Sequence, residues 1–455
     1  MKHVRINQIA FLAVFAVLFP AFGRVYYFSG NGATNERGYL ISDKANWQDL
    51  ASMPPADSDI LGLRNVSGKT CVLSLNADLT IGRWSVEDNN GKNLAFDFSP
   101  YTFEATGVCS GGSNQGNLLT LKSGVLKCVT LNVPHSGAMR DNVFIAKGVN
   151  SSVLVKTFGM TKGTNNVFCV CDGAAFGNYR DASQDLKLFN DASIESYRNV
   201  FCVSNATVRN YKTIQLNGGR ENTVRLENVT FLDLSNAAMT PGFSFADGQN
   251  NVLELIRQDV VVESNADLAI FGNNTIGCKV QIAGGASLMH TNWNKQVQVG
   301  ANSTTAISNF VHVTGAGSTL GYNGAIILGK HYAPYSGLLV EDGGVVKYVQ
   351  SSGGGGGTTY IGQGASHGNW VRVEGAGSVF APANVTMGCG DKADTTLGVA
   401  YGNENKLTIS RGATATVSAL QVGFFNSLSF FLRPAGRQCR YCHKSCKCFF
   451  HIASS

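Results

Sequence analysis

Short runs in which apolar and polar residues alternate recur through the second half of the chain. Alternation with a period of two predicts β-strands and excludes a helical repeat. The longer runs are KVQIAGGASL (279–288), FVHVTGAGSTL (310–320), GLLVEDGGVV (337–346), WVRVEGAGSVF (370–380) and KLTISRGATATV (406–417). Each is followed by a shorter run that ends in glycine: QVQVG, AIILG, TTYIG, NVTMG and LQVG. These pairs of runs predict repeated units of two strands each.

The units recur about every 30 residues, a period that is typical of a solenoid. Two short strands cannot bury an apolar face alone, so we expect each unit to coil into one rung that pairs with the next about 4.8 Å away. The usual handedness of parallel crossovers favours a right-handed coil. Glycine-rich inserts such as 351–357 differ in length between units and are expected to project as loops.

The same organisation is predicted further towards the N-terminus, with less regular spacing. Asparagine precedes an apolar strand at Asn142, Asn166, Asn199 and Asn251, and short strands separated by glycine turns occupy 61–135. An Asn-Trp, Pro-Pro and Asp-Ser-Asp patch predicts a cap, because the end of a stack otherwise exposes strand edges and core. The predicted fold is all-β: a single elongated right-handed parallel β-helix (β-solenoid) at 61–425 with an N-terminal cap at 24–60.

The first residues, 1–23, predict a secretory signal peptide. Lys2 and Arg5 form a basic start, an apolar run extends over 9–22, and small residues at 21–23 offer a cleavage site. The apolar run is shorter than the roughly 20 residues that a membrane-spanning helix needs. We therefore expect an exported protein, at the cell surface or outside the cell, with no transmembrane helix after removal of the signal.

Composition limits the classes of partner. Charged residues make up 15% and hydrophobic residues 44% of the chain, which argues against general disorder. The formal net charge of +6 arises from the signal region and the C-terminal residues, so the body between them is close to neutral. A neutral body lacks the basic surface that nucleic-acid binding requires, and no nucleic-acid partner is expected.

The 12 cysteines fall into two groups. Eight are scattered, and most of these are predicted to act as small buried hydrophobes. Cys169 and Cys171 lie on one side of the same predicted strand and would need a neighbouring strand for a disulfide partner. The other four lie in a basic tail at 426–455, which is predicted to lie outside the fold: Cys439, Cys442, Cys446 and Cys448.

Four interpretations of this tail remain open. A frameshifted or truncated gene end is the simplest explanation of the abrupt change in charge, turn residues and cysteine density after Phe425. The others are an unstructured basic tail, a zinc–thiolate cluster, and a haem-attachment Cys-x-x-Cys-His motif. No cofactor is assigned on this basis.

Aligning the units on their corner glycines places Asp342 and Glu374 on neighbouring rungs, with carboxylates about 5 Å apart, a separation that suits a retaining glycosidase. The glycines used are Gly284, Gly315, Gly343, Gly375 and Gly412. The column that precedes them is Ala283, Thr314, Asp342, Glu374 and Arg411. No obvious aromatic cluster for stacking on a sugar lies nearby, and a solvated corner is the simpler interpretation. We therefore assign no catalytic, cofactor-binding or metal-binding residue.

The segment GAIILGKH at 324–331 is close to a phosphate-binding loop. It lacks the Ser or Thr that would hold magnesium, and its AIIL run is typical of a buried strand where a flexible loop is needed. We expect a strand here and no nucleotide site.

The repeat segments VTGAGSTLGYNGAIILG, VEGAGSVFAPANVTMG and NKLTISRGATATVSALQVG resemble the repeat of autotransporter passengers and PEP-CTERM-associated bacterial surface proteins. The resemblance is good over 279–423 and only compositional over 60–278. The NWQDL and PPADSDILGL segments are similar to the opening module of such proteins. The chain departs from that family at its end, where no Pro-Glu-Pro sorting signal is recognisable.

This resemblance implies a secreted or surface-displayed bacterial β-solenoid with a structural or adhesive role and no catalysis. Its expected partners are cell-surface glycans or other surface proteins, which would bind along polar ladders or projecting loops. The alternative is a β-helical carbohydrate-active enzyme, a polysaccharide lyase or glycosidase.

Overall fold

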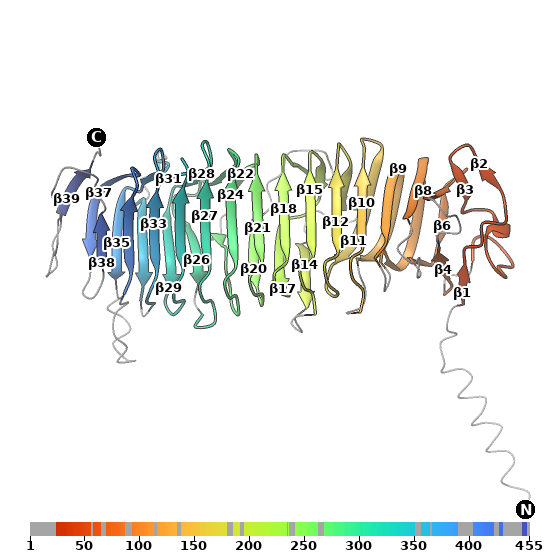
Figure 1. Ribbon diagram of the computed structural model, residues 1–455, viewed down its shortest axis with the longest axis horizontal. Coiled ribbons are helices and arrows are strands. Elements are labelled where there is room, and N and C mark those ends of the chain that lie inside the picture. The colour runs from red at the N-terminus through yellow and green to blue at the C-terminus, as the bar shows by residue number, and fades with distance from the viewer. Residues whose placement is uncertain are drawn as a thin grey trace, which may run out of the picture.

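The computed structural model describes residues 24–55, 58–64, 70–86, 93–112, 116–133, 138–179, 185–191, 195–233, 235, 242–262, 268–301, 303–350, 356–364, 366–389, 404–422, 427–430 and 448–452. The regular elements of these residues are β-strands, apart from one short 3₁₀ helix, η1 (Lys44–Asn46). The strands run across the long axis of the molecule and follow one another side by side from one end to the other (Figure 1). The predicted all-β class is confirmed. Nowhere in these ranges is there a helix long and apolar enough to span a bilayer.

From residue 143 onwards, the strands form three parallel columns. The first column contains β10 (Val143–Lys147), β12 (Val167–Cys171), β15 (Val200–Ser204), β18 (Thr223–Glu227), β21 (Val252–Ile256), β24 (Lys279–Ala283), β27 (Phe310–Thr314), β30 (Gly337–Glu341), β33 (Trp370–Glu374), β36 (Lys406–Ser410) and β38 (Ser427–Phe430). The second contains β11 (Ser151–Gly159), β13 (Ala175–Asn178), β16 (Thr207–Arg209), β19 (Thr230–Leu232), β22 (Asp259–Val262), β25 (Ser287–His290), β28 (Thr319–Tyr322), β31 (Val345–Tyr348), β34 (Val379–Ala381) and β37 (Thr414–Val422). The third contains β14 (Asp185–Asp191), β17 (Thr213–Gly218), β20 (Gly242–Ala246), β23 (Leu268–Ala269), β26 (Gln296–Ala301), β29 (Ala325–Lys330), β32 (Thr358–Gln363) and β35 (Asn384–Cys389).

From β12 to β35, the chain visits the three columns in turn and then returns to the first. Thus β24, β25 and β26 follow one another in sequence, and each pairs in parallel with the strand one unit later, β27, β28 and β29. The first-column strands pair residue for residue, so Lys279, Phe310 and Gly337 occupy equivalent positions. These long parallel sheets are consistent with the predicted solenoid.

The units from β12 to β35 contain three strands each, whereas the alternation predicted two. In the last unit, β37 is continuous and pairs with both β34 and β35. Each of the longer runs bends at its glycine corner into a first-column and a second-column strand. The corner residue that follows the first strand has positive φ, as at Gly284 (63°) and Gly315 (88°), a conformation that glycine adopts without steric cost. The prediction was wrong because apolar alternation continues on both sides of the corner.

Inward-facing side chains form the core. Every second residue of the first-column strands from β10 to β36 is buried, as at Val280, Ile282, Val311 and Val313. In the N-terminal half, phenylalanine takes these positions, and Phe168 and Phe201 stack with ring centroids 5.7 Å apart. Because equivalent residues of neighbouring rungs contact each other, the core is continuous along the stack.

A buried asparagine ladder lies just before the first-column strands. Its members, each no more than 5% exposed, are Asn117, Asn142, Asn166, Asn199, Asn222, Asn251, Asn309, Asn369 and Asn405. From Asn166 onwards, each side-chain Oδ1 accepts the backbone N–H of the equivalent residue one rung earlier, at 2.8–3.1 Å. Cys278 and Ser336 hold two of the equivalent positions. The asparagines predicted at bends therefore serve to join rungs.

The glycines that end the third-column runs make room for this ladder. A Cβ at Gly329 would lie 2.2 Å from Asn369 Oδ1, and one at Gly362 would lie 2.4 Å from Asn405 Nδ2. Both glycines also have positive φ, at 67° and 74°. The rung-ending glycine is thus required by the amide that packs against it.

The N-terminal end contains a packed aromatic cluster. Phe28 and Trp47 are buried with ring centroids 5.4 Å apart, and Trp47 Nε1 donates to the carbonyl of Ile41 at 2.9 Å. The strands of this end are β1 (Val25–Tyr27), β2 (Thr34–Asn35), β3 (Gly38–Leu40), β4 (Ile60–Leu63), β5 (Cys71–Ser74), β6 (Leu79–Ile81), β7 (Arg83–Val86), β8 (Asn93–Ser110) and β9 (Leu118–Asn132). Here β2 and β3 form an antiparallel pair, and the parallel stack starts with β1, β4 and β7.

Two short strands lie within the range predicted as a tail, 426–455. β38 pairs in parallel with β36, and β39 (Cys448–Ile452) pairs antiparallel with β37. The tail residues Cys439, Cys442 and Cys446 lie outside the described residues, as do the predicted signal peptide at 1–23 and most of the loop at 351–357.

Candidate functional site

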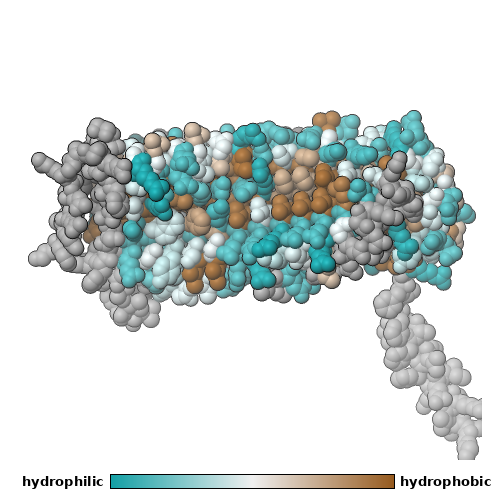
Figure 2. Space-filling view, in the orientation of Figure 1, coloured by the Kyte–Doolittle hydropathy of each residue, from teal (hydrophilic) through white to brown (hydrophobic). Residues whose placement is uncertain are grey.

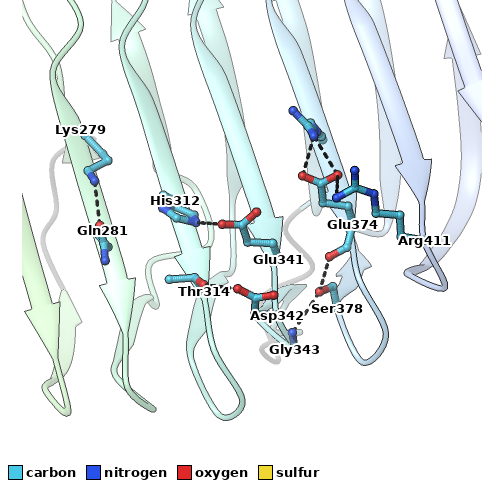
Figure 3. Close-up of polar contacts among 11 residues, drawn as sticks. Lys279, Gln281, His312, Thr314, Glu341, Asp342, Gly343, Glu374, Ser378 and Arg411 are labelled. Carbon is cyan, nitrogen blue, oxygen red and sulfur yellow. Dashed lines mark hydrogen bonds and ion pairs between the residues drawn. The ribbon is translucent and has the colours of Figure 1, made fainter.

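The outward face of β24, β27, β30, β33 and β36 brings together the polar residues that the sequence singled out (Figure 3). Alternate residues of a strand point to opposite sides, and the strict register aligns the outward ones in rows across the rungs. The row at the C-terminal ends of these strands is Ala283, Thr314, Glu341, Glu374 and Ser410. The middle row is Gln281, His312, Leu339, Arg372 and Thr408.

The predicted pairing of Asp342 with Glu374 is wrong by one residue. Glu341 is the in-register neighbour of Glu374, and Asp342 is the first residue of the following corner, with φ of 52°. In this rung and in the rung of Arg411 (φ 56°), a residue other than glycine adopts the left-handed conformation. Alignment on Gly343 and Gly412 therefore shifted the column by one position.

Glu374 lies beneath two guanidinium groups. Its side chain is 10% exposed, and its carboxylate forms ion pairs with Arg372 at 2.7 Å and with Arg411 at 3.6 Å. The two arginine side chains are 51% and 75% exposed, so they separate the carboxylate from the surface. Both Glu374 oxygens are thus already engaged with basic groups.

Glu341 pairs instead with a histidine of the preceding rung. Its Oε1 lies 2.8 Å from His312 Nε2, and the His312 side chain is 15% exposed. Burial lowers the pKa of His312, while the adjacent Glu341 carboxylate acts in the opposite direction. The two neighbouring glutamates therefore have separate partners, His312 for Glu341 and the two arginines for Glu374.

The corner below these rows is held by hydroxyl groups. Ser378 Oγ donates to the carbonyl of Glu374 at 2.8 Å and accepts the backbone N–H of Gly343 at 3.1 Å. Thr314 Oγ1 donates to Asp342 Oδ2 at 3.4 Å, and Asp342 is exposed. These contacts connect neighbouring corners, which fits the solvated-corner interpretation of Asp342.

Two aromatic rings lie on the same face, in the row at the N-terminal ends of the strands. Phe310, Gly337 and Trp370 are in register, and the Phe310 and Trp370 centroids are 6.0 Å apart. A Cβ at Gly337 would lie 2.2 Å from the Trp370 ring, so the indole covers the intervening glycine. These rings lie at the other end of the same strands, four residues or roughly 13 Å along the backbone from Glu341 and Glu374. The sequence pattern did not single them out, and alignment of the first residues of the three strands would have found the pair of rings.

The remaining chemical candidates have structural roles. Ala325–Lys330 is strand β29, with Ile326, Ile327 and Leu328 fully buried, so the P-loop-like segment is a strand as predicted. Lys330 Nζ donates to Gln296 Oε1 at 3.2 Å. Within the described ranges there is no group of three or more His, Cys, Asp or Glu side chains arranged to hold a metal ion.

Comparisons with known proteins identify no relative. No family model, no curated protein and no solved structure matches the chain.

Proposed function

We propose that the chain is a closed right-handed parallel β-helix that is exported and displayed at the cell surface, where it has a structural or adhesive role without catalysis. The parallel columns support closure, because the chain returns to the first column after each third strand. The handedness follows from the strong preference of parallel crossovers for the right hand. Export rests on the signal-like sequence at 1–23.

The observation that carries the adhesive role is the outward face of β27, β30 and β33. It combines the Phe310 and Trp370 rings with the ion-paired Arg372 and Glu374. Aromatic rings offer apolar contact area at little cost in conformational entropy, and the charged rows beside them offer hydrogen-bond donors and acceptors. A surface of this kind suits a cell-surface glycan, whose sugar rings have an apolar face and a rim of hydroxyls.

A glycan array with Trp370→Ala tests this proposal. The matched control is Trp293→Ala, since Trp293 is more exposed (48%) than the half-buried Trp370 and lies away from this face, in the turn between β25 and β26. We expect the native protein to bind a subset of glycans, Trp370→Ala to weaken that binding at least about tenfold, and Trp293→Ala to leave it unchanged. Equal binding by all three proteins would refute the proposed face, and absence of glycan binding would refute the adhesive role towards glycans.

The second candidate is a carbohydrate-active enzyme, and one observation favours it. Glu341 and Glu374 are in register on adjacent strands, whose backbones are about 4.8 Å apart. Release of reducing sugars or of unsaturated oligosaccharides from polysaccharides would support this candidate, provided that Glu341→Gln and Glu374→Gln each abolish it. Activity that survives both substitutions would exclude this pair as the catalytic one.

A further inference from the structure

Three half-buried cysteines lie on the outward face of the N-terminal half. Cys169 and Cys171 are both outward-facing residues of β12, and Cys202 is an outward-facing residue of the neighbouring strand β15. The sequence predicted that the β12 cysteines would need a partner from another strand. The register supplies one, because Cys169 and Cys202 are directly paired.

The pairing suits a bond between Cys169 and Cys202 and not one to Cys171. Neighbouring parallel strands lie about 4.8 Å apart, which is within the Cα separations that disulfides span. Cys171 faces Ser204 on one side and Lys147 on the other, so it has no thiol opposite it. The surrounding face is apolar, and Figure 2 shows hydrophobic residues gathered over β10, β12 and β15, where Val143, Val167 and Val200 lie.

The charges around the pair distinguish the two thiols. A hydrogen bond from Cys169 and the positive charge of Arg225 on β18 lower the pKa of Cys202 to about 7, against burial and the more distant Glu254. The same hydrogen bond and burial raise the pKa of Cys169. Burial raises the pKa of Cys171, and the negative charge of Asp172 raises it further. Cys202 is therefore the thiol that ionises first, with Cys169 as its donor.

We propose that Cys169 and Cys202 are a redox pair that forms a reversible disulfide between two rungs by exchange with a small or protein disulfide, RSSR. The Cys202 thiolate attacks one sulfur of RSSR and expels RS⁻, giving a mixed disulfide. Cys169 then loses its proton and attacks Cys202 Sγ, which expels the second RS⁻. Two protein thiols are oxidised by two electrons, and RSSR is reduced to two RSH, which take up the two thiol protons.

The bond would join β12 to β15 and enclose one rung, including β13 and β14. A cross-link of this kind restricts the unfolded chain and opposes the separation of the two rungs. The oxidised and reduced forms would then differ in the ease with which this part of the stack opens. This role is independent of the adhesive face, which lies on β27 to β33.

Peptide mapping after oxidation tests the proposal directly. The full-length protein is treated with oxidised glutathione, alkylated, and digested with trypsin without reduction. Cleavage at arginine and lysine places Cys169 and Cys171 in peptide 163–180 and Cys202 in peptide 199–209. We expect these peptides to be linked in the native protein and in Cys171→Ser, and to be unlinked in Cys169→Ser. Linkage that persists in Cys169→Ser, or glutathione adducts without linkage in the native protein, would overturn the proposal.

A second measurement separates a redox pair from two thiols that only pack together. The rate at which iodoacetamide alkylates Cys202 should rise with pH around a midpoint near 7. In Cys169→Ser, a hydroxyl replaces the thiol that donates a hydrogen bond to Cys202. We therefore expect the midpoint of Cys202 alkylation to differ from that of the native protein. A Cys202 midpoint at the ordinary value of about 8.5 in both proteins would contradict the proposed thiol–thiolate pair. The buried Cys278 serves as an internal control, since it should remain unmodified while the stack is intact.

Discussion

Removal of one ladder amide, by Asn222→Ala, tests the account of what joins the rungs. Asn222 is fully buried, and its Oδ1 accepts the backbone N–H of Asn199 at 2.8 Å and Ser196 Oγ at 3.3 Å. Its Nδ2 donates to the carbonyl of Ser196 at 3.2 Å. The truncation removes all three hydrogen bonds together, in a position that the neighbouring rungs cover.

The expected cost follows from which groups keep another partner. The Ser196 carbonyl still accepts the N–H of Arg220 at 2.9 Å, and Ser196 Oγ still donates to the carbonyl of Met160 at 2.9 Å. The N–H of Asn199 loses its ladder acceptor inside the stack, and an unsatisfied buried donor costs about 1–3 kcal/mol. Adding the two lost bonds, we expect the free energy of opening this region to fall by about 2–4 kcal/mol.

The assay is native-state hydrogen exchange, because a stacked protein can open in parts and a single unfolding midpoint would average over them. Amides of β15 and β18 should exchange roughly 30- to 1000-fold faster in Asn222→Ala, at 1.4 kcal/mol for each factor of ten. The control is Asn217→Ala, because Asn217 is a half-buried outward residue whose Nδ2 donates to Gln215 Oε1 of the same strand at 3.0 Å and not to a neighbouring rung. This variant should change the free energy by about 0.5 kcal/mol or less. Equal exchange rates in the two variants would refute the reasoning.

Three further predictions follow from the same contacts. Gly329→Ala should lower the unfolding midpoint far more than Gly285→Ala, although both glycines have positive φ. The new Cβ would lie 2.2 Å from Asn369 Oδ1 at position 329, but 4.0 Å from its nearest neighbour at position 285, so equal losses would contradict the steric argument. Because the pKa of His312 is lowered in the folded state, protonation favours the unfolded chain, and the free energy of unfolding should fall as pH drops from about 6.5 towards the folded pKa. His312→Gln should remove this part of the pH dependence. If urea titrations at pH 7.5 and 5.5 show the same pH dependence in the variant as in the native protein, His312 is not its source. Arg411→Ala should cost at most about 1 kcal/mol in urea unfolding, because the Arg411 side chain is 75% exposed and Arg372 still pairs with Glu374; a larger loss would show that Arg411 is needed to neutralise that carboxylate.

Local alternation was sufficient to predict the first-column and third-column strands over 279–389. Phe310 to Thr314 alternates inward and outward residues as predicted, and its glycine-ended partner run is strand β29. The same signal did not separate the second-column strand from the first, because the left-handed corner at Gly315 changes the direction of the chain without interrupting the apolar pattern. The corner becomes visible only when Asp342 and Arg411 are recognised as residues that adopt the same conformation.

The burial of polar residues was harder to predict. Asn166 and Asn199 precede apolar strands, which is also what an exposed turn residue would do. Each amide is buried because the backbone N–H that it accepts is supplied by the previous rung, about one unit away in sequence. The prediction that most of the scattered cysteines are buried holds for Cys71, Cys109, Cys128 and Cys278, and fails for the three on the outward face, for which the facing strand matters equally.

The outward face changes character along the stack, while the core stays apolar throughout. Over β12 and β15 it is apolar and includes the thiol pair, over β18 and β21 it contains Glu227 with Arg225 and Arg257, and over β27 to β33 it is aromatic and polar. Inward residues must match the rungs on both sides, because each fills a continuous column, whereas outward residues face solvent and are free to differ from rung to rung. Neighbours within a row are separated by a whole unit of sequence, so a site forms only where substitutions in two or three units happen to align. Function on such a stack is therefore determined by register, and the two sites proposed above differ in chemistry because they occupy different rungs of one invariant frame.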